Sequence, residues 1–405
     1  MVGQAHGNKM SVSFVDKRLP SILRGLVSVV SDRIANRPIT NYFKTKSDCC
    51  VLMTYITYPF RWGVSLTHSN SAETIEVAKI FRDFGYRVDA VNYDSLVRLD
   101  YSRYQFIFGF GDPLINSYYF RQSKILTVYY GTGMHVFRQN PETLRRIEEV
   151  YRKRGQWILE SGRIVDKAYS VQTSLVDAMI TLGNDDVVET YRKYYRGKIY
   201  KVPISYQRVL DAEELIQSKD FREARQNFLW FGGRGLIHKG LDLVLEVFSE
   251  CPDLHLHVCG PMDDEPKFKS LYFEELYTRP NIHTYGYVKL DSPLFRELLR
   301  KCAFAVFPSC SEGGGGSVIN MMGNGGLLPV VTRESSIDLN DYGVPIRSTS
   351  LEDVRSAVHY AAAMDTHEIA ARSRRCAETV KEHHSIENYS RQMRWAISEI
   401  ISGSG

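Results

Sequence analysis

Two short stretches, far apart in the sequence, combine residue types that bind phosphate. In the first, FGGRGLIHKG, Arg234 and Lys239 stand five residues apart directly after an apolar run. In the second, FPSCSEGGGGSV, Glu312 and four glycines separate an apolar run from a segment with helical character. Glycines let backbone N–H groups approach a ligand closely, and a helix N-terminus favours an anion. The two stretches predict a phosphate site beside one carboxylate, which can accept hydrogen bonds from hydroxyl groups.

Each stretch alone also has a plain structural interpretation. The glycines can form a flexible turn, and Arg234 and Lys239 can be solvated loop charges. Together they favour a site, because loops at the carboxyl ends of parallel strands share one edge of a sheet. The two cations would converge on a diphosphate and neutralise its charge as it leaves. The pattern GxxxxGK[ST] is absent, which argues against an ATPase.

The composition is that of a folded protein with two or three domains. Of 405 residues, 43% are hydrophobic, and seven cysteines show no CxxC spacing, as expected of reduced thiols in the cytoplasm. No apolar run is long enough to predict a transmembrane span, and the N-terminus lacks a secretory pattern. Residues 1–205 hold 29 Lys and Arg against 19 Asp and Glu, and the remainder holds 22 against 28. The basic first half indicates an anionic partner.

Apolar runs alternate with amphipathic segments from Cys50 onward, and the pattern restarts near residue 207. This predicts an α/β protein with two doubly wound, Rossmann-like parallel sheets. We expect an N-terminal domain over 1–206 with a poorly assigned extension at 1–47, a second domain over 207–375 and a helical segment over 376–405. Within the extension, residues 19–34 predict an amphipathic helix that could pack on the first domain or lie on a membrane surface.

The apolar runs give specific positions for strands and helices. Helices are expected at 71–84, opened by Asn70 and Glu73 as a capping pair, at 141–157 and at 174–182. Strands are expected at 51–57, 87–93, 106–111, 124–130, 167–172 and 200–204 in the first domain, and at 228–232, 254–260, 282–285, 304–307 and 328–332 in the second.

The second domain resembles the retaining glycosyltransferases of the B-fold group, family-four-like (glycosyl transferases group 1). The resemblance rests on "GR, four residues, KG" at 233–240, and on "PS, two residues, EG", a glycine-rich helix start and "PVV" at 308–331. It implies two Rossmann-like domains that face a cleft, with the sugar donor on the second domain and the acceptor on the first. It also implies that residues 376–405 cross back onto the first domain.

The resemblance assigns roles to single residues. The family residues that match Arg234 and Lys239 hold the diphosphate of a nucleoside-diphosphate sugar, and the one that matches Glu312 contacts hydroxyls of the transferred sugar. The glycines and helix start offer backbone donors, here from Gly314, Gly315, Gly316 and Ser317.

One position departs from the family pattern. A second glutamate, eight positions after the first, normally grips the ribose hydroxyls, and this chain has Asn320 there. Asparagine lacks the charge that strengthens a bidentate grip on a diol, so we expect weaker or altered ribose binding. Asn320 could instead cap the helix start, or mark a relative without catalytic activity.

Family members place a histidine after a first-domain strand, facing the reaction centre. His135, in the turn GTGMH, is the first candidate for this catalytic position and His68 the second, although either could be incidental. Gly63 follows the first strand, where the family has a glycine loop near donor and acceptor, and is a further candidate for substrate binding.

The resemblance implies no metal and no cofactor, because cationic side chains and a helix dipole replace the ion. The run 263–265 (DDE) lacks the D-x-D spacing and predicts a solvated turn. The basic clusters at 151–154 and 191–198 predict solvated helix faces, or surfaces for anionic lipid or a lipid-diphosphate acceptor. No nucleic-acid-binding module accompanies them.

These observations lead us to expect a metal-independent hexosyl- or deoxyhexosyltransferase of polysaccharide biosynthesis. It would move sugar from a nucleoside-diphosphate sugar to a hydroxyl of a glycan or lipid-linked acceptor, with retention, in the cytoplasm and as a peripheral protein at the inner face of the membrane. A sugar-nucleotide epimerase on the same fold and a non-catalytic partner subunit that binds a nucleotide-sugar or glycan stay open. Convergent carboxylates and histidines would favour the epimerase, and Asn320 favours the subunit.

Overall fold

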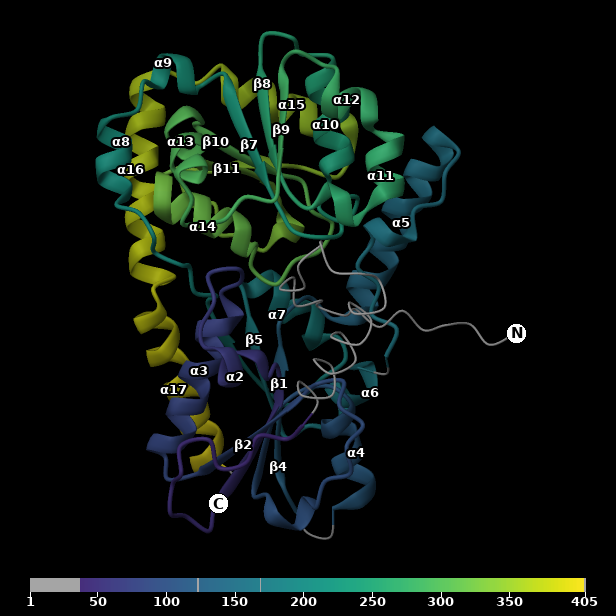
Figure 1. The fold of residues 1–405 in the computed structure, drawn as a ribbon, viewed down its shortest axis with the longest axis vertical. Helices are drawn as coiled ribbons and strands as arrows, with labels where there is room; N and C mark the ends of the chain where they lie inside the picture. Colours follow the sequence, from purple (N-terminus) through teal and green to yellow (C-terminus); the bar gives the residue numbers. More distant parts are fainter. Residues whose placement is uncertain (1–36, 122–123, 168, 404–405) are drawn as a thin grey trace, which may run out of the picture.

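The computed structural model describes residues 37–121, 124–167 and 169–403 (Figure 1). Within them lie two six-stranded parallel sheets, each flanked by helices and stacked along the long axis of the molecule. The expected architecture of two doubly wound α/β domains is therefore confirmed. The amphipathic segment expected at 19–34 lies outside the described residues.

The first sheet has the strand order β2-β1-β3-β4-β5-β6. Strands β1 to β5 are largely buried because helices cover both faces, whereas the edge strand β6 exposes two lysines. They are β1 (Cys50–Tyr55), β2 (Arg87–Asn92), β3 (Phe106–Gly109), β4 (Leu126–Gly131), β5 (Ala178–Leu182) and β6 (Lys198–Val202).

The second sheet has the order β12-β11-β10-β7-β8-β9. The strands before the two phosphate-binding stretches, β7 and β10, are hydrogen-bonded neighbours. Both stretches therefore leave the same edge of the sheet side by side. The strands are β7 (Asn227–Phe231), β8 (His255–Cys259), β9 (Ile282–Gly286), β10 (Phe304–Phe307), β11 (Leu328–Thr332) and β12 (Val344–Ile346).

The helices alternate with the strands, as doubly wound topology requires. In the first domain they are α2 (Tyr58–Trp62), α3 (Asn70–Asp83), α4 (Asp112–Phe120), α5 (Val136–Arg154), α6 (Tyr169–Leu175) and α7 (Asp185–Arg192). In the second they are α8 (Ala212–Gln217), α9 (Phe221–Ala224), α10 (Leu241–Ser249), α11 (Pro266–Leu271), α12 (Phe273–Tyr277), α13 (Pro293–Lys301), α14 (Gly316–Gly325) and α15 (Leu351–Ala362), followed by α16 (Thr366–His383) and α17 (Ile386–Ser402).

Two expectations at the end of the first domain are wrong. The strand expected at 167–172 is the helix α6, and the helix expected at 174–182 contains the strand β5. The run AMITL of β5 is buried between β4 and β6. A short, fully buried apolar run cannot be told from a helix by periodicity alone, and its length is what favours a strand.

Within the described residues, the chain passes between the domains twice. The first passage is the irregular linker 203–211, and the second is the junction between α16 and α17. Helix α16 still packs on α14 of the second domain, whereas α17 lies on α3 and β6 of the first (Figure 1). The return therefore lies at His384–Ser385 rather than at residue 376. The two passages are joined by a hydrogen bond of 2.8 Å from the Tyr206 N–H to the His384 carbonyl.

Glu73 does not cap helix α3. It is 1% exposed and accepts hydrogen bonds from the Ser205 N–H and Oγ in the linker, at 2.8 and 2.9 Å. Burial raises the pKa of Glu73 to about 7 from its ordinary 4.5, because desolvation outweighs the hydrogen bonds from Ser205 and from the Ser69 side chain.

This shifted carboxyl predicts a pH dependence of stability. Between about pH 4.5 and 7 the folded protein keeps a proton that the unfolded chain releases, so the free energy of unfolding falls as pH rises and levels off above pH 7. Glu73→Gln keeps the acceptor for Ser205 without the charge. We expect it to match the wild type at pH 4.5 and to exceed it at pH 8 by up to about 3 kcal/mol in denaturant unfolding. Equal losses of stability in both proteins would contradict this role.

Candidate functional site

The two phosphate-binding stretches meet where β7 and β10 end. Gly240, the last residue before α10, has φ of 71°, and a Cβ there would lie 2.3 Å from the Pro308 carbonyl oxygen. Only glycine allows both this backbone conformation and this approach. The close contact fixes the loop 232–240 against the loop 308–315.

Lys239 and Glu312 form a buried ion pair across these loops. The Lys239 Nζ donates to Glu312 Oε1, and the two residues are 8% and 9% exposed. Ser309 Oγ donates to the same carboxylate at 3.2 Å. Burial works to raise the pKa of Glu312, but Lys239 and then Arg163 outweigh it and lower the pKa to about 2. Glu312 is therefore ionised at neutral pH.

Arg163 is a cation at this site that the sequence analysis missed. It comes from the first domain, in the segment between α5 and α6, and its Nη1 lies 3.3 Å from Glu312 Oε2. Its side-chain methylenes pass over Gly235, and its carbonyl accepts a hydrogen bond of 2.8 Å from Gln139. No pattern around residue 163 distinguishes it from other surface arginines, so only the fold identifies it.

Arg234 does not contact Glu312. Its guanidinium pairs with Asp264 at 3.1 Å, and its side chain is 54% exposed. Of the two cations expected to converge, Lys239 is therefore at the Glu312 loop, and Arg163 occupies the second position there.

His238 connects the loop that carries Glu312 to helix α5. The ring is fully buried, with Nε2 2.6 Å from the Ser311 carbonyl and Nδ1 2.8 Å from Thr143 Oγ1 of α5. Burial lowers its pKa to about 3, so it is neutral and orients the loop without adding charge. The one sequence signal that points to His238 is its position directly before Lys239.

The glycine loop provides unpaired backbone donors. Among the hydrogen bonds of the described residues, none uses the N–H of any residue from Gly313 to Ser317 at the start of α14. Gly314 and Gly315 are buried, while Gly316 and Ser317 keep some exposure. A Cβ at Gly313 would lie 2.4 Å from the Thr132 carbonyl oxygen, so the loop also touches the first domain. Free N–H groups at a helix N-terminus favour a phosphate.

Asn320 contacts the interdomain linker, and Gly63 lies in an exposed loop. The Asn320 amide is 7% exposed and binds the interdomain linker, with its Oδ1 accepting from the Gln207 N–H at 2.8 Å. It does not cap the helix start. Gly63 ends α2 in an exposed loop with φ of 83°, and a Cβ there would meet no neighbour within 4 Å.

The two candidate histidines differ in their surroundings. His135 is 1% exposed and caps α5, because its Nδ1 accepts from the Phe137 N–H at 3.2 Å. Its Nε2 lies 3.1 Å from Thr173 Oγ1, and its ring stacks on Tyr194 at 4.4 Å. Both nitrogens are thus occupied within the first domain, and burial lowers the pKa of His135 to about 4.

His68 lies in the first-domain loop before α3, within electrostatic reach of Lys239 and Glu312. The residue is exposed, yet desolvation, followed by the charges of Arg163 and Lys239, lowers its pKa to about 4. The Asn70 N–H donates to Nδ1 at 3.1 Å, which leaves the proton of the neutral ring on Nε2. His68 is therefore a neutral donor close enough to the Lys239–Glu312 pair to feel its charges.

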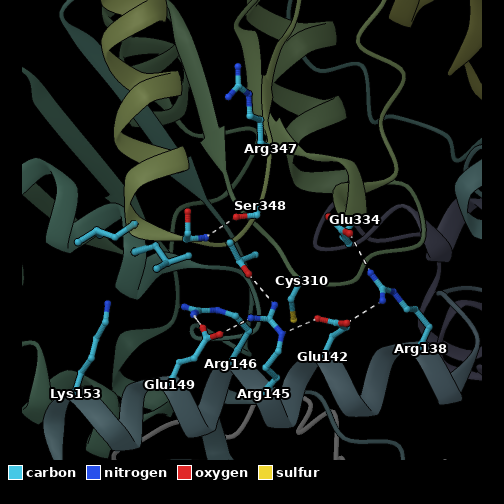
Figure 2. Close-up of a pocket in the computed structure, with 14 residues that line it drawn as sticks. Arg138, Glu142, Arg145, Arg146, Glu149, Lys153, Cys310, Glu334, Arg347 and Ser348 are labelled. Atoms are coloured by element: carbon cyan, nitrogen blue, oxygen red, sulfur yellow. Dashed lines mark hydrogen bonds and ion pairs between the residues drawn. The ribbon is translucent and has the colours of Figure 1, made fainter.

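A hollow of about 650 Å³ separates α5 from the second domain, and Figure 2 shows the charged side chains around it. Its cations are mostly bound to partners across the domain boundary. Arg138 pairs with Glu334 at 3.0 Å, and Arg145 donates to Thr349 at 2.8 Å. Arg146, 2% exposed, pairs with Asp242 of α10. The hollow is lined by an ion-pair network that joins the domains.

The same network corrects the expectation for the basic cluster at 151–154. Lys153 pairs with Glu246 at 3.0 Å and Arg154 with Glu275 at 2.6 Å, both in the second domain. These side chains are interface residues rather than a solvated face.

The acidic run 263–265 is a solvated turn only in part. Glu265 is 1% exposed and accepts from the Gly235 and Leu236 N–H groups at 2.6 and 3.2 Å, which holds the loop before Lys239 in place. The described part of the chain contains no group of metal-ligating side chains suited to an ion. It also contains no helix with the length and apolar character to span a bilayer.

The fold and these two loops are similar to those of known glycosyltransferases. Residues 212–337 match the family model of glycosyl transferases group 1, and they include the Lys239 and Glu312 loops. The second domain is thus similar to that family over these residues, as its two motifs predicted. The search of curated proteins found no match.

Solved structures share the two-domain fold at low identity. Sucrose-phosphate synthase from Thermosynechococcus elongatus is similar with a TM-score of 0.60 and 11% identity, over 88% of this chain and 100% of that one. HepE from Anabaena, in complex with UDP and glucose, gives 0.56 and 10% over 86% and 99%. A UDP-forming α,α-trehalose-phosphate synthase from Burkholderia xenovorans gives 0.56 and 11% over 89% and 100%.

Proposed function

We propose that this protein is a retaining glycosyltransferase that uses a nucleoside-diphosphate sugar and a glycan or lipid-linked acceptor. The observation that carries the proposal is the buried Lys239–Glu312 pair beside the free N–H groups of the glycine loop. It supplies one cation and several donors for a diphosphate, next to an ionised acceptor for sugar hydroxyls. The solved complexes of HepE with UDP and with UDP-glucose support this class of donor.

In this proposal the ion pair opens when the donor binds. Lys239 turns to the diphosphate, while Arg163 continues to balance the charge of Glu312, which accepts hydrogen bonds from the sugar. The acceptor oxygen forms its bond to the anomeric carbon as the bond to the diphosphate breaks, on the same face. The leaving phosphate oxygen takes the acceptor proton, and Lys239 and the α14 N-terminus stabilise the developing charge.

We also propose that the chemistry needs no metal ion and no cofactor, because fixed cations do this work. The cytoplasm, at the inner face of the membrane, is the expected location, with the exposed basic residues of 191–198 as the candidate lipid contact.

A non-catalytic binding subunit is the second candidate. Two observations favour it: Asn320 is engaged by the linker, and His135 is enclosed by the first domain.

Release of nucleoside diphosphate from UDP-, GDP- and dTDP-sugars separates the two functions. A transferase releases it from one donor class, faster with a glycan or lipid-linked acceptor, and Lys239→Ala strongly slows the release. A donor that binds and never turns over, whatever acceptor is offered, would support the binding subunit instead.

The two histidines give a paired prediction. We expect His68→Ala to lower kcat about 100-fold, because a neutral hydrogen-bond donor near the Lys239–Glu312 pair is lost. The melting temperature should stay unchanged. His135→Ala should lower the melting temperature, since a helix cap and a ring stack disappear. Activity measured below each variant's melting transition tests this, and the reverse pattern would return the catalytic position to His135.

A further inference from the structure

Helix α14 lies between the glycine loop and the interdomain linker, and one side chain connects the two. Asn320 Nδ2 donates to the carbonyl of Gly316, the first residue of α14, at 2.9 Å. Its Oδ1 accepts from the Gln207 N–H of the linker at 2.8 Å. Both halves of the amide are therefore used, and only a side chain that donates and accepts can form both bonds.

The next turn of α14 repeats this attachment. Asn324 Oδ1 accepts from the Val209 and Leu210 N–H groups at 2.8 and 3.0 Å, and Nδ2 donates to the Gln207 carbonyl at 2.9 Å. The linker has no regular secondary structure, so these side chains bind backbone groups that would otherwise lack partners. The two asparagines thus fix the path of residues 207–210 across the helix.

The linker also touches the first-domain loop that leads to His68. Gln207 Nε2 donates to the Ser65 carbonyl at 3.0 Å, and Ser65 N–H donates to Ser71 Oγ at 2.9 Å. A continuous series of hydrogen bonds therefore runs from Gly316 through Asn320 and Gln207 to the loop before His68.

We propose that Asn320 is a positioning residue: its amide couples the phosphate-binding end of α14 to the linker, and through Gln207 to the loop that carries His68. The inference rests on the proposed function of this site. Asn320 then occupies the ribose-binding position of the resembled family without binding ribose. Diphosphate held at Gly313 to Ser317 fixes the first turn of α14, and the amide transmits that order to the domain junction.

Three variants separate this role from that of a ribose ligand. Asn320→Ala removes both bonds, Asn320→Asp keeps the acceptor for the Gln207 N–H but loses the donor to Gly316, and Asn324→Ala is the matched control one turn away. We expect Asn320→Ala and Asn320→Asp to change the Kd for UDP less than threefold and to lower kcat with UDP-glucose at least tenfold. If the protein prefers a donor with another base, the corresponding nucleoside diphosphate and nucleotide sugar replace UDP and UDP-glucose.

Amide hydrogen exchange provides the direct readout. Without ligand, Gln207 should exchange at least tenfold faster in Asn320→Ala, and Val209 and Leu210 should do so in Asn324→Ala. Adding UDP should slow exchange at Gln207 in the wild type and in Asn324→Ala, but not in Asn320→Asp.

A Kd for UDP weakened tenfold or more in Asn320→Ala, with unchanged exchange at Gln207, would overturn the inference and make Asn320 a ribose ligand. If no nucleotide binds the wild type, the proposed function fails. Exchange in ligand-free Asn320→Ala then tests separately whether Asn320 holds the linker at Gln207. Unchanged exchange at Gln207 would overturn that attachment, and faster exchange would support it.

Discussion

Lys239→Ala should reduce turnover about 100- to 1000-fold at saturating donor, the usual effect of losing one charged donor to a leaving group. The reason is the position of Lys239, whose ammonium group is buried beside Glu312 at the free N–H groups of the glycine loop. Removing it also leaves the Glu312 carboxylate with Arg163 as its remaining cationic ion-pair partner among the described residues. Steady-state rates of nucleoside diphosphate release measure the effect.

Arg234→Ala is the matched control for Lys239→Ala. Arg234 lies in the same loop, but it is half exposed and pairs with Asp264, so we expect it to lower turnover less than tenfold. Equal losses in the two variants would mean that Arg234 leaves Asp264 and joins Lys239 on the diphosphate. Unchanged turnover in Lys239→Ala, with the melting temperature preserved, would contradict the role of the ion pair.

The largest expected effect on stability is at Arg146. Its guanidinium is 2% exposed and bridges Asp242 of the second domain and Glu149 of its own helix. Arg146→Ala leaves the Asp242 carboxylate buried without its partner, so we expect a loss of about 3 to 5 kcal/mol in the free energy of unfolding. Denaturant unfolding at pH 7 measures it.

Arg152→Ala is the control for this ion pair. Arg152 is on the same helix but 72% exposed, and its pair with Glu148 should contribute less than about 1 kcal/mol. If Arg146→Ala and Arg152→Ala unfold alike, the network around the hollow in Figure 2 does not hold the domains together.

The sequence predicts much of the second domain because its signals are local. Strand periodicity, the glycines and the order of the two stretches identify β7, β10 and the start of α14, and they bring Lys239 to Glu312. In the first domain a similar analysis exchanges helix and strand at α6 and β5, because a short buried run satisfies both patterns.

The remaining parts of the site depend on contacts between distant residues. Arg163 lies 149 positions from Glu312, and Glu73 lies 132 positions from Ser205. No spacing rule connects such pairs, since they meet only when the domains pack. For the same reason the sequence does not predict the pair of Arg234 with Asp264, which belongs to another loop. The sequence also does not predict the contact of Asn320 with Gln207, because Gln207 lies in a linker that has no helix or strand periodicity.

Thermal unfolding in the presence of UDP-, GDP- and dTDP-sugars tests the central claim most directly, because a ligand that binds the folded state alone raises the melting temperature. The claim is that Lys239 and the glycine-lined start of α14 hold one diphosphate. We predict that one nucleotide class raises the melting temperature of the wild type and of Arg152→Ala, and that the rise disappears in Lys239→Ala. No rise with any nucleotide, or the same rise in Lys239→Ala, would contradict the account.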